Sequence, residues 1–225
     1  RECGARRLAP PNPEGGGRAC ASLGKGNGVE GLFCTLADRG FFDKAGLATF
    51  CRFGTRLIGH PNNKIPGIEM NTGALGHGLY VATGMAKGLK MSGRANRVYT
   101  LMGDGEQAEG SIWEAAMAAS HYGLDNLTAI IDRNRLQISG DTEAVMAQEP
   151  MAERWKAFGW HVVELDGHDM DALVAEFGRE PVPGRPRMII ARTVKGKGVR
   201  EMENIAKWHH GVPDGELLAS AMRQF

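Results

Sequence analysis

Short apolar runs alternate along the chain with segments whose apolar residues recur every three or four positions. Residues 98–102 and 127–131 are two such runs, of the kind found in strands of a sheet that is covered on both faces. The segment between them predicts a helix with one smooth apolar face, formed by Ile112, Ala115, Ala116 and Ala119. A crossover of this length closes a parallel βαβ unit, so we expect both strands to end at the same edge of one sheet.

The alternation continues on both sides of this unit. Ser111, followed three residues later by Glu114, predicts a capping box at the start of the central helix. A helix that opens near 72–78 would bury Leu79, Ala82, Ala86 and Leu89. Further strands are predicted at 160–165 and 187–191, and further helices at about 32–36, 47–53, 151–158 and 169–177, the last of them capped by Asp169. The fold class expected from this order is α/β, a parallel sheet with helices on both faces.

Composition narrows the choice of function. The formal charge is +1 and no long basic block is present, which argues against binding to nucleic acid or to a membrane surface. No apolar stretch reaches the length of a membrane span, no signal-peptide pattern opens the sequence, and the four cysteines are scattered, so we expect a cytoplasmic protein with reduced thiols. Residues 1–19 are rich in Arg, Pro and Gly and lack periodicity, and we expect a flexible arm there, followed by one domain over 20–225.

Polar residues follow the two central strands at the point where each strand ends. Asp104 comes just after the first strand and Asn134 just after the second. A carboxylate, an amide oxygen and a nearby turn carbonyl are ligands suited to Mg²⁺ or Ca²⁺. Gly103 and Gly105 allow the backbone to pass close to a ligand, and they lead towards a helix N-terminus, which favours phosphate. Together these residues predict a diphosphate held by a divalent cation at the carboxyl edge of the sheet.

Two other glycine-rich segments suggest different ligands, and neither is supported by its context. Residues 26–31 match GxGxxG, but only a weak apolar stretch precedes them and no clear second strand leads to an acidic partner, so a nicotinamide site is not expected. Residues 193–198 carry Lys195 and Lys197 past the last strand, but they lack the glycine and hydroxyl positions of a P-loop. Solvated lysines in a loop would be the ordinary interpretation of that pair.

The motif residues carry a resemblance to a known family. Gly103-Asp104-Gly105-Glu106, with Asp132-Arg133-Asn134 at the next strand end, resembles the thiamine-diphosphate motif. The amino-acid sequence of residues 105–116 is similar to that of transketolases in particular, and the similarity runs from about Lys25 to Phe225. The chain resembles the N-terminal, diphosphate-binding subunit of a transketolase split into two polypeptides. This resemblance implies a thiamine-diphosphate-binding fold and the transfer of a two-carbon ketol unit from a ketose phosphate to an aldose phosphate, as in the pentose phosphate pathway.

The resemblance also implies roles for individual residues. A divalent cation, Mg²⁺ or Ca²⁺, would be held by Asp104, Asn134 and the carbonyl of Leu136. His60 and His209 would orient sugar hydroxyls and move protons, for which imidazole is suited near neutral pH. The spacing of Lys195 and His209 is similar to that of a lysine and histidine near the family's cofactor. The residues that would contact thiamine diphosphate are Gly73, Ala74, Leu75, Gly105, Glu106, Asn134, Lys195 and His209.

The resemblance further implies that half of the site comes from elsewhere. In the family a second domain grips the aminopyrimidine ring, and a glutamate of that domain activates the cofactor. We therefore expect the partner to be a C-terminal transketolase subunit, the substrates to be sugar phosphates, and the assembly to be a dimer of heterodimers. The single chain is expected to be inactive alone.

Two departures from the family pattern leave alternatives open. Asn27 stands where relatives carry a histidine, and an amide cannot accept and return a proton near neutral pH. Residues 1–19 do not resemble the helical segment that relatives carry before this point. One alternative is another thiamine-diphosphate enzyme, related to deoxyxylulose-phosphate synthase or acting on unusual sugars. The other is a truncated or degenerate subunit that binds without catalysing.

Overall fold

A parallel sheet organises the described part of the chain. The computed structural model describes residues 19–224, except for the side chain of Asn27, so most of the expected arm and the Asn27 side chain lie outside the described residues. Within that range the large sheet has the strand order β1–β2–β3–β7–β6, and every pair in it is parallel. Its strands are β1 (Cys20–Leu23), β2 (Val98–Gly103), β3 (Leu127–Arg133), β6 (His161–Asp166) and β7 (Arg187–Arg192).

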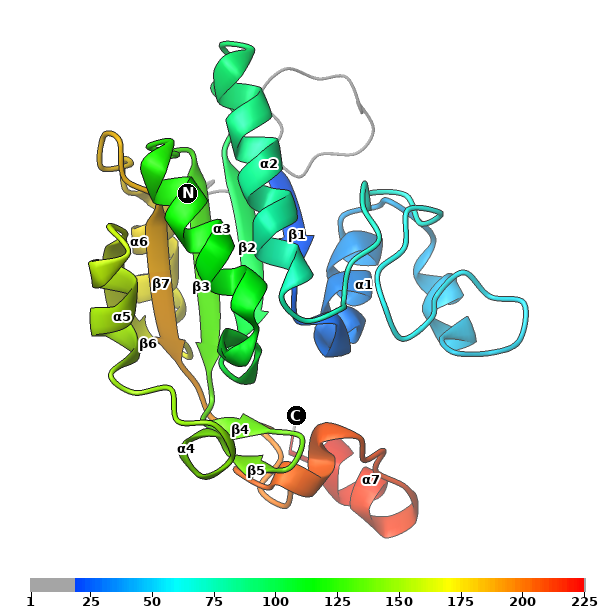
Figure 1. Cartoon of the computed structure of the whole chain (residues 1–225). Coiled ribbons are helices and arrows are strands. Elements are labelled where there is room, and N and C mark those ends of the chain that lie inside the picture. Colours follow the sequence, from blue (N-terminus) through cyan, green and yellow to red (C-terminus); the bar gives the residue numbers. More distant parts are fainter. Residues whose placement is uncertain (1–18, 225) are drawn as a thin grey trace.

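Helices cover both faces of this sheet (Figure 1). On one face α2 (His77–Met91), α3 (Gly110–His121) and α5 (Met151–Ala157) pack on the side chains of Val98 and Met102. On the other face lies α6 (Met170–Gly178), whose Phe177 ring meets Tyr99 at 5.9 Å between centroids. Val98 and Tyr99 are consecutive residues of β2, so their side chains point to opposite faces of the sheet, and each packs against a different layer of helices. The α/β class predicted from the sequence is confirmed.

The central βαβ unit is built as predicted. Val98 pairs with Leu127 and Met102 with Ile131 in a parallel register, so β2 and β3 end side by side. The predicted apolar face of α3 is buried, at Ile112, Ala115, Ala116 and Ala119. In α2 the side chains of Leu79, Ala82 and Ala86 are fully buried and Leu89 is partly buried. Burying that much apolar surface between α2, α3 and the sheet is the main source of stability in this region.

Some local predictions were wrong. The capping box is absent, because α3 begins at Gly110 with Glu109 as N-cap, and the Ser111 hydroxyl donates instead to the carbonyl of Gly76 at 3.0 Å. The helix predicted at 47–53 is replaced by a short 3₁₀ turn, η3 (Lys44–Thr49). The helix predicted at 32–36 is longer than expected and forms α1 (Val29–Asp38). In contrast, the predicted cap of α6 is confirmed, because the Asp169 carboxylate accepts from the Ala172 N–H at 2.9 Å.

Several short elements gather beyond the carboxyl ends of the strands. They form the lower part of Figure 1, beneath the strand arrowheads. The hairpin β4–β5 begins three residues after β3 ends, and α7 lies near the end of the chain. The remaining short elements are η2 (Gly26–Gly28), η4 (Gly105–Ala108), β4 (Leu136–Gln137), β5 (Gly140–Asp141), α4 (Thr142–Val145), η5 (Ala206–His209) and α7 (Gly215–Met222). In the described range, no helix combines the length and the apolar character that crossing a membrane requires.

Candidate active site

Asp104 lies at the carboxyl edge of the sheet, at the end of β2. It follows β2 directly and caps η4, with its carboxylate Oδ1 accepting from the Gly105 N–H at 2.8 Å. The other oxygen, Oδ2, accepts from Arg133 Nη1 at 3.0 Å and from the Arg135 N–H at 2.6 Å. Asp104 is only 1 % exposed. Burial raises the pKa of its carboxyl, and the hydrogen bond from Arg133 opposes that rise by favouring the charged form.

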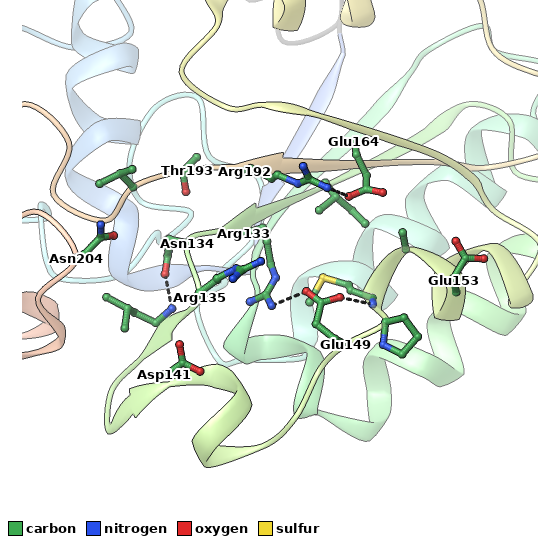
Figure 2. A pocket seen from close by; sticks show the side chains of 16 residues that line it. Arg133, Asn134, Arg135, Asp141, Glu149, Glu153, Glu164, Arg192, Thr193 and Asn204 are labelled. Atoms are coloured by element: carbon green, nitrogen blue, oxygen red, sulfur yellow. Dashed lines mark hydrogen bonds and ion pairs between the residues drawn. The ribbon is translucent and has the colours of Figure 1, made fainter.

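Asn134 belongs to the turn that closes on Asp104. It follows β3 directly, and its Oδ1 accepts from the Leu136 N–H at 2.9 Å, as Figure 2 shows. Arg135, between them, takes a left-handed conformation with φ of 64°, which points its N–H at the Asp104 carboxylate. The structure therefore brings the turn formed by residues 134–136 against Asp104 at one sheet edge.

A second group of side chains lies at the same edge, on the α6 side of the sheet. Asp132 accepts from the ammonium of Lys25 and from the hydroxyl of Thr193. Lys195 lies near them, with its Nζ 3.4 Å from Nδ1 of His209. Burial alone would raise the pKa of Asp132, but the charge and hydrogen bond of Lys25 outweigh it and hold that pKa below its ordinary value. The two predicted residues, Lys195 and His209, are thus brought together beside a lysine–aspartate pair.

His209 is kept neutral by its surroundings. Burial, followed by the charge of Lys195, lowers its pKa from 6.5 to about 4. Burial also lowers the pKa of Lys195, and the nearby Lys25 lowers it further. A neutral imidazole can accept a hydrogen bond from a hydroxyl group, and an ammonium beside it attracts anions such as phosphate.

We expect the His209 ring to remain neutral at about pH 5.5, where an ordinary histidine is mostly protonated. In Lys195→Met the pKa of His209 should rise towards 6.5, because one of the two main causes of its depression is removed. Histidine-selective NMR titration measures both values. The matched control is Lys197→Met, on the same loop but paired with Glu203 at 3.8 Å. Equal pKa values for His209 in the wild-type chain and in Lys195→Met would contradict this assignment.

Three loops meet closely around His60. A Cβ built on Gly73 would lie 2.2 Å from His60 Cδ2, and one built on Gly26 would lie 2.3 Å from the Gly73 Cα. Gly73 also has a φ of +118°, which side chains rarely tolerate. The predicted sugar-facing histidine and the predicted cofactor-contacting segment are therefore adjacent, and Leu75 in that segment is exposed.

Gly26→Ala should open this junction. The new methyl group would meet the backbone of Gly73 rather than the end of a flexible side chain, so the loops must separate. We expect cofactor affinity to fall by roughly 10-fold or more, since displacement of binding groups by about 1 Å has costs of that order. Gly28→Ala, whose Cβ meets nothing within 4 Å, is the matched control. Calorimetric titration of both variants measures the difference, and equal affinities would show that the close approach is not needed.

Glu106 has partners within the protein. Its carboxylate accepts from the N–H groups of Gly76 at 3.0 Å and Gly103 at 3.1 Å, and it is almost completely buried. Burial raises the pKa of Glu106, and the two backbone N–H groups counter that rise. The side chain therefore ties the start of α2 to the end of β2, which leaves the backbone of Gly105 and Glu106 as the part that a cofactor could contact.

The sequence pattern did not indicate several residues of the site. Arg133 and Asp132 lie inside the motif that gave Asn134, and the strand pattern places them on opposite faces of β3. Because consecutive residues of a strand point to opposite faces, Asp132 and Arg133 could have been predicted to belong to two separate polar clusters, one on each face of the sheet. Lys25 and Thr193 carry no such signal, because their contact with Asp132 joins segments more than 60 residues apart in sequence.

Known proteins resemble this chain over nearly its whole length. The family model described as transketolase, thiamine diphosphate binding domain, matches residues 5–224. The chain belongs to the transketolase family. It is 51 % identical over 219 residues to an apulose-4-phosphate transketolase subunit of Phocaeicola vulgatus, covering 97 % of this chain and 78 % of that one. It is 41 % identical over 220 residues to a 6-deoxy-6-sulfo-D-fructose transketolase subunit, SqwG, of Clostridium sp. The match covers 97 % of this chain and 80 % of that one.

Solved transketolases share the fold. The structure of the transketolase from Campylobacter jejuni superposes with a TM-score of 0.86 at 30 % identity, covering 96 % of this chain and 35 % of that one. This transketolase chain thus spans most of the relatives that are named as subunits, but about a third of the solved enzyme chain. The predicted identity, a transketolase N-terminal subunit of the two-chain type, is confirmed, and the family model supports thiamine diphosphate as cofactor.

The residues of this transketolase chain suit the diphosphate end of that cofactor. Among the described residues no three His, Cys, Asp or Glu side chains gather into a metal-binding group. Mg²⁺ commonly uses one or two protein carboxylates and completes its shell with phosphate oxygens and water, so the single carboxylate of Asp104 beside an amide fits that cation. Gly105 adds close packing, since a Cβ there would lie 2.8 Å from Gln137 Cβ.

A large polar cavity adjoins the same turn. It has a volume of about 820 Å³ and is shown in Figure 2. Asn134, Arg135 and Leu136 line one side of the cavity. Glu164 and Arg192 line another side and form an ion pair with each other, with 2.6 Å between Arg192 Nη2 and Glu164 Oε2. The cavity is therefore continuous with the carboxyl edge and gives solvent access to the turn that faces Asp104.

Proposed function

We propose that this transketolase chain holds the diphosphate of thiamine diphosphate through a divalent cation, Mg²⁺ or Ca²⁺, bound by Asp104, Asn134 and the carbonyl of Leu136. Together with a separate chain, it transfers a two-carbon ketol unit from a ketose phosphate to an aldose phosphate. The bound cofactor supplies the electron sink for breaking and making a carbon–carbon bond next to a carbonyl.

One observation supports this proposal above the others. Asp104 and the turn of Asn134 end neighbouring parallel strands, and the 2.6 Å bond from the Arg135 N–H to Asp104 holds them together. Open α/β sheets bind their ligands at this edge. The carboxylate is buried and already fixed in place, so little ordering is needed when a cation binds.

The remaining predicted residues take the roles of binding and proton transfer. Lys195 attracts anionic oxygens, while His209, neutral beside it, accepts a hydrogen bond from a sugar hydroxyl, and with a pKa of about 4 it can hold that proton only transiently. His60 packs on Gly73, so the sugar-facing ring lies next to the segment of Gly73, Ala74 and Leu75. These residues bind and orient the substrate near the cofactor and exclude water from it.

The proposal includes a partner chain. The relatives from Phocaeicola vulgatus and Actinobacillus succinogenes are each named as one subunit of an apulose-4-phosphate transketolase, and the solved enzyme is about three times longer than the part matched here. The expected partner is a C-terminal transketolase subunit that supplies the pyrimidine-binding half, in a dimer of heterodimers. The named sugars of the relatives, apulose 4-phosphate and 6-deoxy-6-sulfo-D-fructose, favour a ketose outside the common pentose phosphates.

The experiment is a ketol-transfer assay on the assembly purified through a tag on this chain. Thiamine diphosphate, MgCl₂ and an aldose phosphate acceptor are supplied with a panel of donor ketoses, both common and branched or sulfonated. Transfer that requires both chains supports the proposal, and the best donor identifies the sugar class. Cofactor binding without transfer from any donor would favour the non-catalytic alternative that Asn27 raises, and transfer by this chain alone would refute the need for a partner.

A further inference from the structure

Arg133 is the most connected side chain at the carboxyl edge. It is the last residue of β3 and is 5 % exposed. Its Nη1 donates to Asp104 Oδ2 at 3.0 Å and to Thr142 Oγ1 at 2.9 Å. Its Nη2 donates to Glu149 Oε1 at 2.7 Å, as Figure 2 shows, and lies 3.5 Å from Glu143 Oε1. One guanidinium thus joins β2, α4 and the start of α5.

These bonds determine what Asp104 has left to offer. A carboxylate has about four acceptor positions, two on each oxygen. Oδ2 already accepts from Arg133 and from the Arg135 N–H, and Oδ1 accepts from the Gly105 N–H. One position remains, on Oδ1.

We propose that Arg133 is a positioning residue that restricts Asp104 to binding the cation through a single oxygen, and so favours Mg²⁺ over Ca²⁺. This inference rests on the proposed function. Mg²⁺ takes six ligands at short distances, each from a single oxygen, whereas Ca²⁺ takes up to eight and readily uses both oxygens of one carboxylate. Because Arg133 takes the acceptor position on Oδ2 that the Arg135 N–H leaves, binding of the cation through both oxygens is blocked.

The same side chain orders the other ligands. The bond to Thr142 anchors α4, which directly follows the β4–β5 hairpin that contains Leu136. Lysine could keep the charge at this position, but its compact ammonium cannot match the planar fork that reaches Asp104, Thr142 and Glu149 together. Removal of the Arg133 side chain should therefore loosen the hairpin and free one of the two acceptor positions on Oδ2, while the Arg135 N–H keeps the other.

The experiment compares thiamine diphosphate affinity in saturating MgCl₂ and in saturating CaCl₂, by calorimetry on the tagged assembly. The variants are Arg133→Met and Arg133→Lys. The matched control is Arg192→Met, the last residue of the neighbouring strand β7, which pairs with Glu164 rather than Asp104. We expect Mg²⁺-supported affinity to fall by about 10- to 100-fold in Arg133→Met, as for other residues that orient metal ligands. Ca²⁺-supported affinity should fall at least about 5-fold less.

The outcomes separate this inference from the proposed function. Arg133→Lys should shift the ratio of the two affinities in the same direction, and it provides the test if Arg133→Met does not fold. An equal loss of affinity with both cations, or no loss, would overturn the role of Arg133 while leaving the cofactor site intact. If the wild-type assembly binds thiamine diphosphate equally with and without a divalent cation, the proposed function fails, and this inference fails with it.

Discussion

Asp104→Asn is expected to lower the affinity for thiamine diphosphate by about 100-fold or more, which corresponds to roughly 3 kcal/mol. The carboxylate accepts from Gly105 on one oxygen and from Arg133 and Arg135 on the other. An amide group has only one oxygen, so its NH₂ must face donors on one of these two sides. The variant therefore loses the charge that attracts the cation and also the geometry of the turn that carries Asn134.

The measurement is calorimetric titration of the assembly with cofactor in saturating MgCl₂. Asp171→Asn, which removes a carboxylate from the exposed first turn of α6, serves as control and should bind like the wild type. Wild-type affinity in Asp104→Asn would show that the diphosphate is held elsewhere.

Trp160→Ala should lower the free energy of unfolding by about 3–5 kcal/mol, the usual range for removing a large aromatic side chain from a core. Trp160 is fully buried, its ring lies 4.9 Å from that of Trp155, and its Nε1–H donates to the Ala116 carbonyl at 3.0 Å. The substitution leaves a cavity between α3, α5 and β6 and also leaves that carbonyl without its indole partner.

Urea denaturation of the assembly, followed by circular dichroism, measures this loss. Trp160→Phe keeps most of the volume and should cost less, and Met117→Ala, on the exposed side of α3, should change stability by no more than about 0.5 kcal/mol. A Trp160→Ala variant as stable as Met117→Ala would mean that the packing around Trp155 contributes little.

The central βαβ unit was predictable because its signals are local. The apolar runs that form β2 and β3 are each interrupted only by a threonine, a residue that is common in strands, and the small residues of α3 repeat at helical spacing. The spacing of the apolar residues and the lengths of the segments therefore predict the same structure. The predicted strand ends alone are enough to place Asp104 and Asn134 at one edge. Strand β1 gave only a weak signal, because it has four residues and includes the polar Ser22.

The parts that were missed depend on contacts between distant segments. Ser111 has the spacing of a cap, but the carbonyl of Gly76 competes for its hydroxyl across 35 residues of sequence. The hairpin β4–β5 has strands of two residues each, too short for any periodicity. In the sequence Arg133 is a charged residue next to Asn134 with no further signal. Its hydrogen bonds to Thr142 and Glu149 become visible only in the folded structure. Secondary-structure propensity and the spacing of apolar residues carry no information about hydrogen bonds between segments that are distant in sequence.

The position of the cation decides whether Asp104 and Asn134 hold the diphosphate. Crystals of the assembly grown with thiamine diphosphate and MnCl₂ in place of MgCl₂ would give an anomalous signal from the metal. We expect one peak per chain within bonding distance of Asp104 Oδ1, Asn134 Oδ1 and the carbonyl oxygen of Leu136, next to the diphosphate. Bound cofactor whose diphosphate lies away from these three atoms, with or without a metal peak, would contradict this expectation.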